Sequence, residues 1–123
     1  MPQYTDSLRG YALRTHRRDG WKCVYCGLDG RESFSSWLSL SEEHLLPKGH
    51  PLRDDPRFIV TACAFCNVAD NQYFSKAQGR GIGFEDKTPE ELIALRKPYV
   101  TETRDSYRTF WERHVRGEKG MRS

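Results

Sequence analysis

Four cysteines arranged as two Cys-x-x-Cys pairs are the clearest chemical signal in the sequence. Cys23 and Cys26 form the first pair, and Cys63 and Cys66 form the second after an interval of 36 residues. Two such pairs can bring four thiolates into a tetrahedron, which is the ligand set of a structural zinc site. Free buried cysteines or a redox-active pair are the alternatives, but two matched pairs with no fifth cysteine argue against both. We therefore expect a closed zinc site that stabilises the fold and leaves no coordination position open for catalysis.

A carboxylate directly before a histidine is the second signal, in the segment LSLSEEHLLPKGH at residues 38–50. Glu43 can bind a cation, and a neutral His44 can take a proton from water, because the unperturbed histidine pKa is about 6.5. Successive residues of a regular strand point to opposite faces, so both side chains can address one site only if the strand ends or bulges there. Pro47 would stop regular pairing shortly afterwards, which favours that hypothesis. The alternative for His44 is an ordinary surface or packed histidine, and Glu42 is expected on the surface.

Two asparagines after the last cysteine extend this group of polar side chains. Asn67 follows Cys66 directly, and Asn71 comes four residues later. Residues i and i+4 share one face of a helix, so both amides can face one site. Asp70 is a rival for the second position, and capping of a helix N-terminus is the alternative role for Asn67. Carboxylate and amide oxygens are hard ligands, which favours Mg²⁺ or Mn²⁺ over Zn²⁺.

Short elements must position these side chains. The alternation of apolar and polar residues predicts strands that deliver His44 and Cys63, and apolar residues at helical spacing predict helices on either side. The predicted elements are a helix within 6–20, a short strand within 21–27, strands over 37–41 and 58–62, and a helix over 67–77.

A longer helix is predicted near the C-terminus. Thr88 as N-cap, Pro89 at the first position and Glu91 at the third form a capping-box pattern. Four apolar residues further along share one helical stripe, which predicts burial in the core: Tyr107, Phe110, Trp111 and Val115.

Size and composition set the class of protein. A chain of 123 residues, with 37% hydrophobic and 30% charged residues, predicts one domain with a modest core that a metal would help to stabilise. It lacks a long apolar run and an apolar leader segment, so we expect no membrane span and a cytoplasmic location. The net charge of +3 comes with basic residues gathered toward both ends. That pattern suits a phosphate-binding surface, and ordinary solvated helix faces are the alternative.

The combination of these motifs resembles the HNH endonuclease family. The matching segments are RRDGWKCVYCG at 17–27, EHLLP at 43–47 and ACAFCN at 62–67, and the resemblance covers about residues 9–76. It implies an α+β fold in a single domain, 1–123, with a small ββα-metal core stabilised by the four-cysteine zinc site. Helices would flank this core at both ends, with a C-terminal helical extension over about 88–117.

The resemblance also implies roles for the site residues. Glu43, Asn67 and Asn71 would bind a catalytic Mg²⁺ or Mn²⁺, and His44 would be the general base that activates water. The implied reaction is hydrolysis of DNA phosphodiester bonds, with the zinc in a purely structural role. We expect neighbouring phosphates to be bound by three basic residues, Arg17, Arg18 and Lys48.

One position departs from the family pattern. Phe58 stands nine residues before Asn67, where the family has an asparagine that braces the loop carrying the base. Another group must then hold His44, and Asp54 and Asp55 are the candidates. Two alternatives to an active enzyme follow: a non-catalytic zinc-stabilised module that binds nucleic acid, or a degenerate nuclease subunit of a larger complex with a protein partner on the C-terminal helix.

Overall fold

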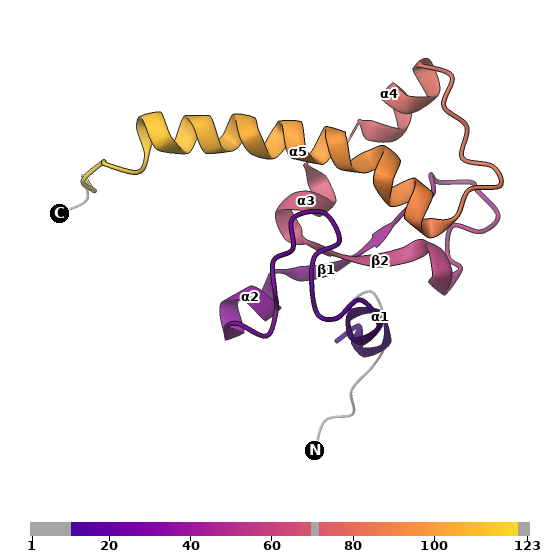
Figure 1. Ribbon diagram of the computed structural model, residues 1–123, viewed down its shortest axis with the longest axis horizontal. Helices are drawn as coiled ribbons and strands as arrows, with labels where there is room; N and C mark the ends of the chain where they lie inside the picture. Colours follow the sequence, from indigo (N-terminus) through magenta and orange to yellow (C-terminus); the bar gives the residue numbers. More distant parts are fainter. Residues whose placement is uncertain (1–10, 70–71, 121–123) are drawn as a thin grey trace.

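The computed structural model describes residues 11–69 and 72–120 and shows a small α+β fold (Figure 1). A short antiparallel pair of strands is followed directly by a short helix, and a long helix crosses above both. In chain order the elements are α1 (Leu13–Arg18), α2 (Phe34–Leu38), β1 (Leu40–His44), the 3₁₀ helix η1 (Pro56–Phe58), β2 (Ile59–Cys63), α3 (Ala64–Val68), α4 (Tyr73–Gly79) and α5 (Pro89–His114).

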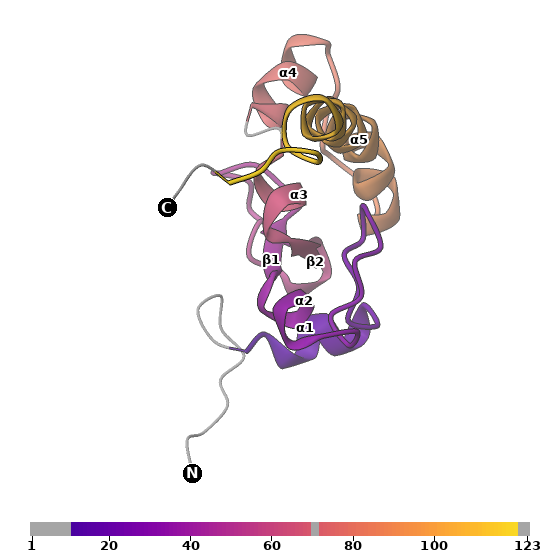
Figure 2. The same ribbon diagram turned by 90° about the vertical axis from the view of Figure 1, so that its left-hand side faces the viewer.

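The two strands pair in a regular register. Leu40 lies opposite Cys63 at one end, and His44 lies opposite Ile59 at the other. In both views the sheet lies between α1 on one side and α3 with α5 on the other (Figures 1 and 2). This layering places one face of β1 against α1 and the other against α3 and α5.

Three of the predicted elements are wrong: residues 21–27 form no strand but only an isolated bridge between Lys22 and Asp29, and two other elements differ in their bounds. Residues 34–38 form α2 rather than the start of a strand, because the Ser33 hydroxyl caps this helix by accepting a hydrogen bond from the Ser36 amide at 3.0 Å. Leu38 is consequently exposed, and the strand begins only at Leu40. The predicted helix over 67–77 is divided, since α3 ends at Val68 and α4 begins at Tyr73.

Two groups of buried side chains both pack against α5. One includes Leu46, Phe58 and Tyr73, and the other surrounds the cysteines. Leu92 and Val100, both 1% exposed, supply the α5 side chains to these two groups. The first half of α5 is therefore an integral part of the core.

The capping box that begins α5 is confirmed, but the predicted core stripe beyond it is wrong. The Thr88 side chain accepts from the Glu91 amide at 3.1 Å, and the Glu91 side chain accepts from the Thr88 amide at 3.0 Å. The stripe residues Tyr107, Phe110, Trp111 and Val115 are 63%, 60%, 43% and 47% exposed. The reason is geometric, since α5 continues past the edge of the sheet (Figure 1), so little of the molecule lies beside its second half. No helix in the described part of the chain is both long and apolar enough to cross a bilayer.

Candidate functional site

The four cysteines form a compact cluster, as predicted. The sulfur atoms of Cys23, Cys26, Cys63 and Cys66 all lie within 4.8 Å of one another, and none is in a disulfide. Gly27 follows the first pair with φ of +77°, a conformation that glycine adopts without strain, and its amide donates to the Cys23 carbonyl at 2.9 Å. The donor set and its spacing fit one tetrahedral metal ion such as zinc.

The thiols of this cluster interact strongly. Hydrogen bonds with Cys63 and Cys66 lower the pKa of the Cys23 thiol, whereas hydrogen bonds with Cys23 and Cys63 raise the pKa of the Cys66 thiol. Arg104 of α5 adds a positive charge, with its Nη1 3.7 Å from the Cys66 sulfur, which suits the negative charge of a four-thiolate site.

The strand β1 separates the two neighbouring residues on which the catalytic prediction rests. Pairing continues in register up to His44 and Ile59, so β1 has no bulge at Glu43 and ends only at His44, after both residues have taken their regular alternating directions. Glu43 therefore points toward α3 and α5 and is 2% exposed, while Glu42 and His44 share the other face.

Glu43 lies against a buried arginine that the sequence analysis missed. The Nη2 atom of Arg96 in α5 is 3.2 Å from Oε1 of Glu43, and the two side chains are 6% and 2% exposed. The Tyr25 hydroxyl donates to the other carboxylate oxygen. Arg96 also lies over the rings of Tyr73 and Phe74, at 5.1 and 5.5 Å from their centroids. The carboxylate and the guanidinium thus form one buried ion pair.

Burial has clear electrostatic consequences here. It raises the pKa of Glu43 to about 7, against the opposing effects of the Arg96 charge and the Tyr25 hydrogen bond. Burial likewise raises the pKa of Tyr25, which stays neutral. The ion pair is also incompletely hydrogen-bonded, because Oε1 of Glu43 and Nε of Arg96 each lack a hydrogen-bond partner among the described residues, as does the hydroxyl of the neighbouring Tyr73.

Asn67 joins the same group but through contacts that hold the fold. Its Nδ2 donates to the Ser41 hydroxyl at 2.9 Å and to the Glu42 carbonyl at 3.2 Å, which ties α3 to β1. The main-chain carbonyl of Asn67 accepts a hydrogen bond from Nη2 of Arg96 at 3.3 Å. The other predicted ligand position, Asn71, lies outside the described residues, as does its rival Asp70.

These contacts decide whether a divalent cation fits at Glu43. Two predicted ligands, Glu43 and Asn67, do come close, but Arg96 contacts the carboxylate of Glu43 and the main-chain carbonyl of Asn67. A divalent ion placed about 4 Å from the guanidinium would be repelled by about 8 kcal/mol at an effective dielectric constant of about 20. The residues in this arrangement therefore do not fit Mg²⁺ or Mn²⁺. Among the described residues, the cysteine cluster is the one group of three or more His, Cys, Asp and Glu side chains close enough to share a metal.

His44 is held where the strand ends, by one of the two predicted candidates. Its Nε2 lies 3.2 Å from Oδ1 of Asp54, and its side chain is 15% exposed. The prediction that Asp54 or Asp55 holds this histidine is confirmed for Asp54, whereas Asp55 caps η1. Phe58 also braces the segment, through its backbone, because its carbonyl accepts from the Leu45 amide at 2.9 Å.

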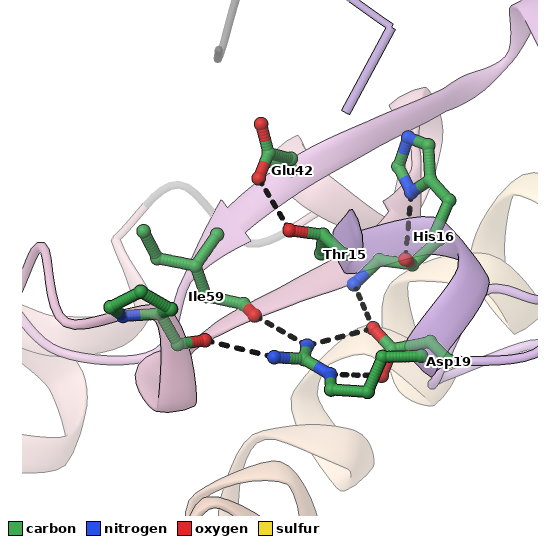
Figure 3. A network of polar contacts seen from close by, with 8 residues as sticks. Thr15, His16, Asp19, Glu42 and Ile59 are labelled. Carbon is green, nitrogen blue, oxygen red and sulfur yellow. Dashed lines mark hydrogen bonds and ion pairs between the residues drawn. The ribbon is translucent and has the colours of Figure 1, made fainter. Parts of the chain in front are cut away.

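A polar network joins α1 to the sheet and includes one of the predicted phosphate-binding residues (Figure 3). The Arg18 guanidinium donates to the carbonyls of Pro56 at 2.9 Å and Ile59 at 2.6 Å, and it pairs with Asp19. Asp19 in turn accepts from the Thr61 amide at 2.8 Å. Arg18 is exposed, as Arg17 and Lys48 are, but its guanidinium is already engaged by Asp19 and by the carbonyls next to β2.

The other half of this network corrects the prediction that Glu42 is a surface residue. The Thr15 hydroxyl donates to Glu42 at 2.7 Å, so Glu42 is a half-buried partner of α1 rather than a free surface residue. Nδ1 of His16, which is 3% exposed, lies 2.7 Å from the Thr61 hydroxyl (Figure 3). These contacts fix the face of β1 on which His44 lies.

Comparisons of the chain with models of protein families, with curated proteins and with solved structures found no match. The resemblance to HNH endonucleases stays a prediction from the three sequence motifs.

Proposed function

We propose that this protein is a zinc-stabilised module of the HNH endonuclease type, which hydrolyses DNA phosphodiester bonds with His44 as the general base. The observation that carries the proposal is the contact between His44 and Asp54 at the end of β1. A carboxylate at Nε2 favours a proton on that nitrogen, which leaves Nδ1 to accept a proton from water. Asp54 would also stabilise the imidazolium that forms.

Zinc at the four cysteines is the structural part of this proposal. The ion would join the loop carrying Cys23 and Cys26 to the end of β2 and the start of α3. A backbone hydrogen bond from Val24 to Thr61, at 3.0 Å, already links this loop to β2. The zinc would therefore fix the sheet that presents His44, at some distance from the chemistry.

DNA binding is the third part of the proposal, and the distal half of α5 supports it. An open groove of about 530 Å³ lies there, lined by Phe65, Tyr107 and Trp111 together with Arg104, Arg108 and Asp105. Exposed aromatic rings beside arginines can stack unpaired bases and bind phosphates at the same time. The exposed Arg17 and Lys48 would add phosphate contacts nearer the sheet.

The plasmid-nicking assay tests the proposal. Zinc-loaded protein is incubated with supercoiled plasmid and Mg²⁺ or Mn²⁺, with EDTA in a parallel sample, and nicked product is measured. The proposal predicts divalent-dependent nicking by the wild type and its loss in His44→Ala. Asp54→Asn should reduce the rate while leaving zinc content unchanged, because it removes the negative charge that orients His44.

One specific observation favours a second candidate. Arg96 forms an ion pair with Glu43 and contacts Asn67, and these are two of the residues predicted to bind the catalytic cation. A zinc-stabilised module that binds nucleic acid without cutting it, alone or as a subunit of a larger complex, needs no such cation. A protein partner on α5 stays a prediction of this candidate. Binding of DNA by zinc-loaded protein, with no cleavage in any divalent metal, would select it.

A further inference from the structure

A positive charge already lies between the residues that were predicted to surround a divalent cation. Nη2 of Arg96 is 3.2 Å from the Glu43 carboxylate and 3.3 Å from the main-chain carbonyl oxygen of Asn67. The sequence predicted a divalent cation bound by the side chains of Glu43 and Asn67, whereas α5 places a guanidinium at the Glu43 carboxylate and at the main-chain oxygen of Asn67.

Packing fixes Arg96 in this position. Leu92 and Val100, one helical turn before and after it, are each 1% exposed, so the three side chains form one buried face of α5. The guanidinium also lies over the rings of Tyr73 and Phe74. Arg96 can therefore leave Glu43 only if this part of α5 moves away from the sheet.

The charges and oxygens of the group also show what would follow if Arg96 were absent. Glu43 and Arg96 balance each other, and Tyr25 is a neutral neighbour. Without the guanidinium, a buried carboxylate with an unpartnered Oε1 would remain beside the carbonyl oxygen of Asn67. Such a group of hard oxygens with one negative charge suits Mg²⁺ or Mn²⁺.

We propose that Arg96 is a built-in cation that excludes divalent metal from Glu43, so that docking of α5 and binding of a divalent ion there are mutually exclusive. The proposal deepens the account of the predicted catalytic site, but it does not depend on hydrolysis. If the protein cuts DNA with a metal at Glu43, then α5 must release Arg96 first.

Binding of Mn²⁺ to the zinc-loaded protein tests this, with paramagnetic broadening of the Glu43 backbone amide signal as the readout. Arg96→Met should bind Mn²⁺ at this position at least tenfold more tightly than the wild type. Lys97→Met, which removes the neighbouring exposed charge on the same helix, should behave as the wild type. The double variant Glu43→Gln with Arg96→Met should lose the gain. Equal affinity in the wild type and Arg96→Met would overturn the proposal.

The wild-type protein offers a second measurement if Arg96→Met does not fold. Amide hydrogen exchange over residues 92–100 is followed as Mn²⁺ is added. If the Glu43 signal is not broadened and the α5 amides stay protected from exchange, the result supports exclusion of Mn²⁺ by Arg96. Broadening of the Glu43 signal together with loss of this protection in α5 supports it as well. Broadening at Glu43 while α5 stays fully protected would refute it. Neither experiment uses nuclease activity, so a failure of the proposed function would leave these results intact.

Discussion

The buried carboxyl group of Glu43 should make the folded protein less stable as the pH rises from about 4.5 to about 7. Burial raises the pKa of this group from 4.5 to about 7. In this window the folded protein binds more protons at Glu43 than the unfolded chain does. The contribution of this group to the free energy of unfolding is therefore fully present below pH 4.5 and is lost as the pH rises through 7.

The size of this effect follows from the same pKa values. A pKa difference of one corresponds to about 1.4 kcal/mol, so the change from 4.5 to about 7 sets an upper limit of about 3 kcal/mol. At 2% exposure, the Glu43 side chain is hardly screened by solvent. The zinc site acts in the opposite direction, since protonated thiols do not bind zinc and the site weakens as the pH falls.

A pair of matched variants separates these two effects. Glu43→Gln removes the titrating group but keeps the size of the side chain, and the contribution of the cysteines is common to both proteins. Urea unfolding at constant zinc, between pH 5 and pH 7, should show the wild type losing about 2 kcal/mol relative to Glu43→Gln, which is the part of the full effect that falls in this range. Glu42→Gln, which changes the adjacent carboxylate on the other face, should follow the wild type.

The reasoning would be refuted if the free energy of unfolding changed with pH by the same amount in the wild type and in Glu43→Gln across this range. Such a parallel response would mean that the Arg96 charge outweighs burial and that Glu43 is ionised throughout this range.

Three further predictions concern the zinc site, the α1 contact and the α5 groove. Cys23→Ser should release zinc and unfold the domain, and a folded variant with full zinc content by metal analysis would contradict the proposed zinc site. Arg18→Met should lower the free energy of unfolding by about 1–2 kcal/mol through loss of its carbonyl contacts, whereas Arg17→Met should change it by less than about 0.5 kcal/mol in the same urea titration. Trp111→Ala should weaken binding of single-stranded DNA by roughly 5- to 100-fold in fluorescence anisotropy, and an equal loss in Phe110→Ala, outside the groove, would argue against base stacking there.

Local signals in the sequence predicted several parts of the fold and of the site. The spacing of the cysteine pairs predicted their cluster, because a tetrahedral site requires that spacing. The pattern from Thr88 to Glu91 predicted the start of α5, since the capping box is made within one turn. The charged residues near Phe58 predicted that a carboxylate would hold His44, and Asp54 does.

The parts that could not be predicted depend on packing between distant segments. Leu38 and Leu40 alternate as a strand would, but the Ser33 cap turns the first of them into the end of a helix. The apolar stripe at Tyr107 resembles a core stripe, yet α5 extends beyond the sheet at that point. Arg96 is an ordinary helix residue by type. Its spacing of four from Leu92 and Val100 was the one signal that placed it on the buried face.

The most direct test of the central claim is the rate of plasmid nicking by zinc-loaded His44→Ala, compared with His114→Ala as a histidine control on the exposed end of α5. Both variants should retain zinc, and divalent-dependent nicking by His114→Ala should match the wild type. Loss of a general base predicts a rate about 10²- to 10⁴-fold lower in His44→Ala. Nicking that survives undiminished in His44→Ala would contradict the account.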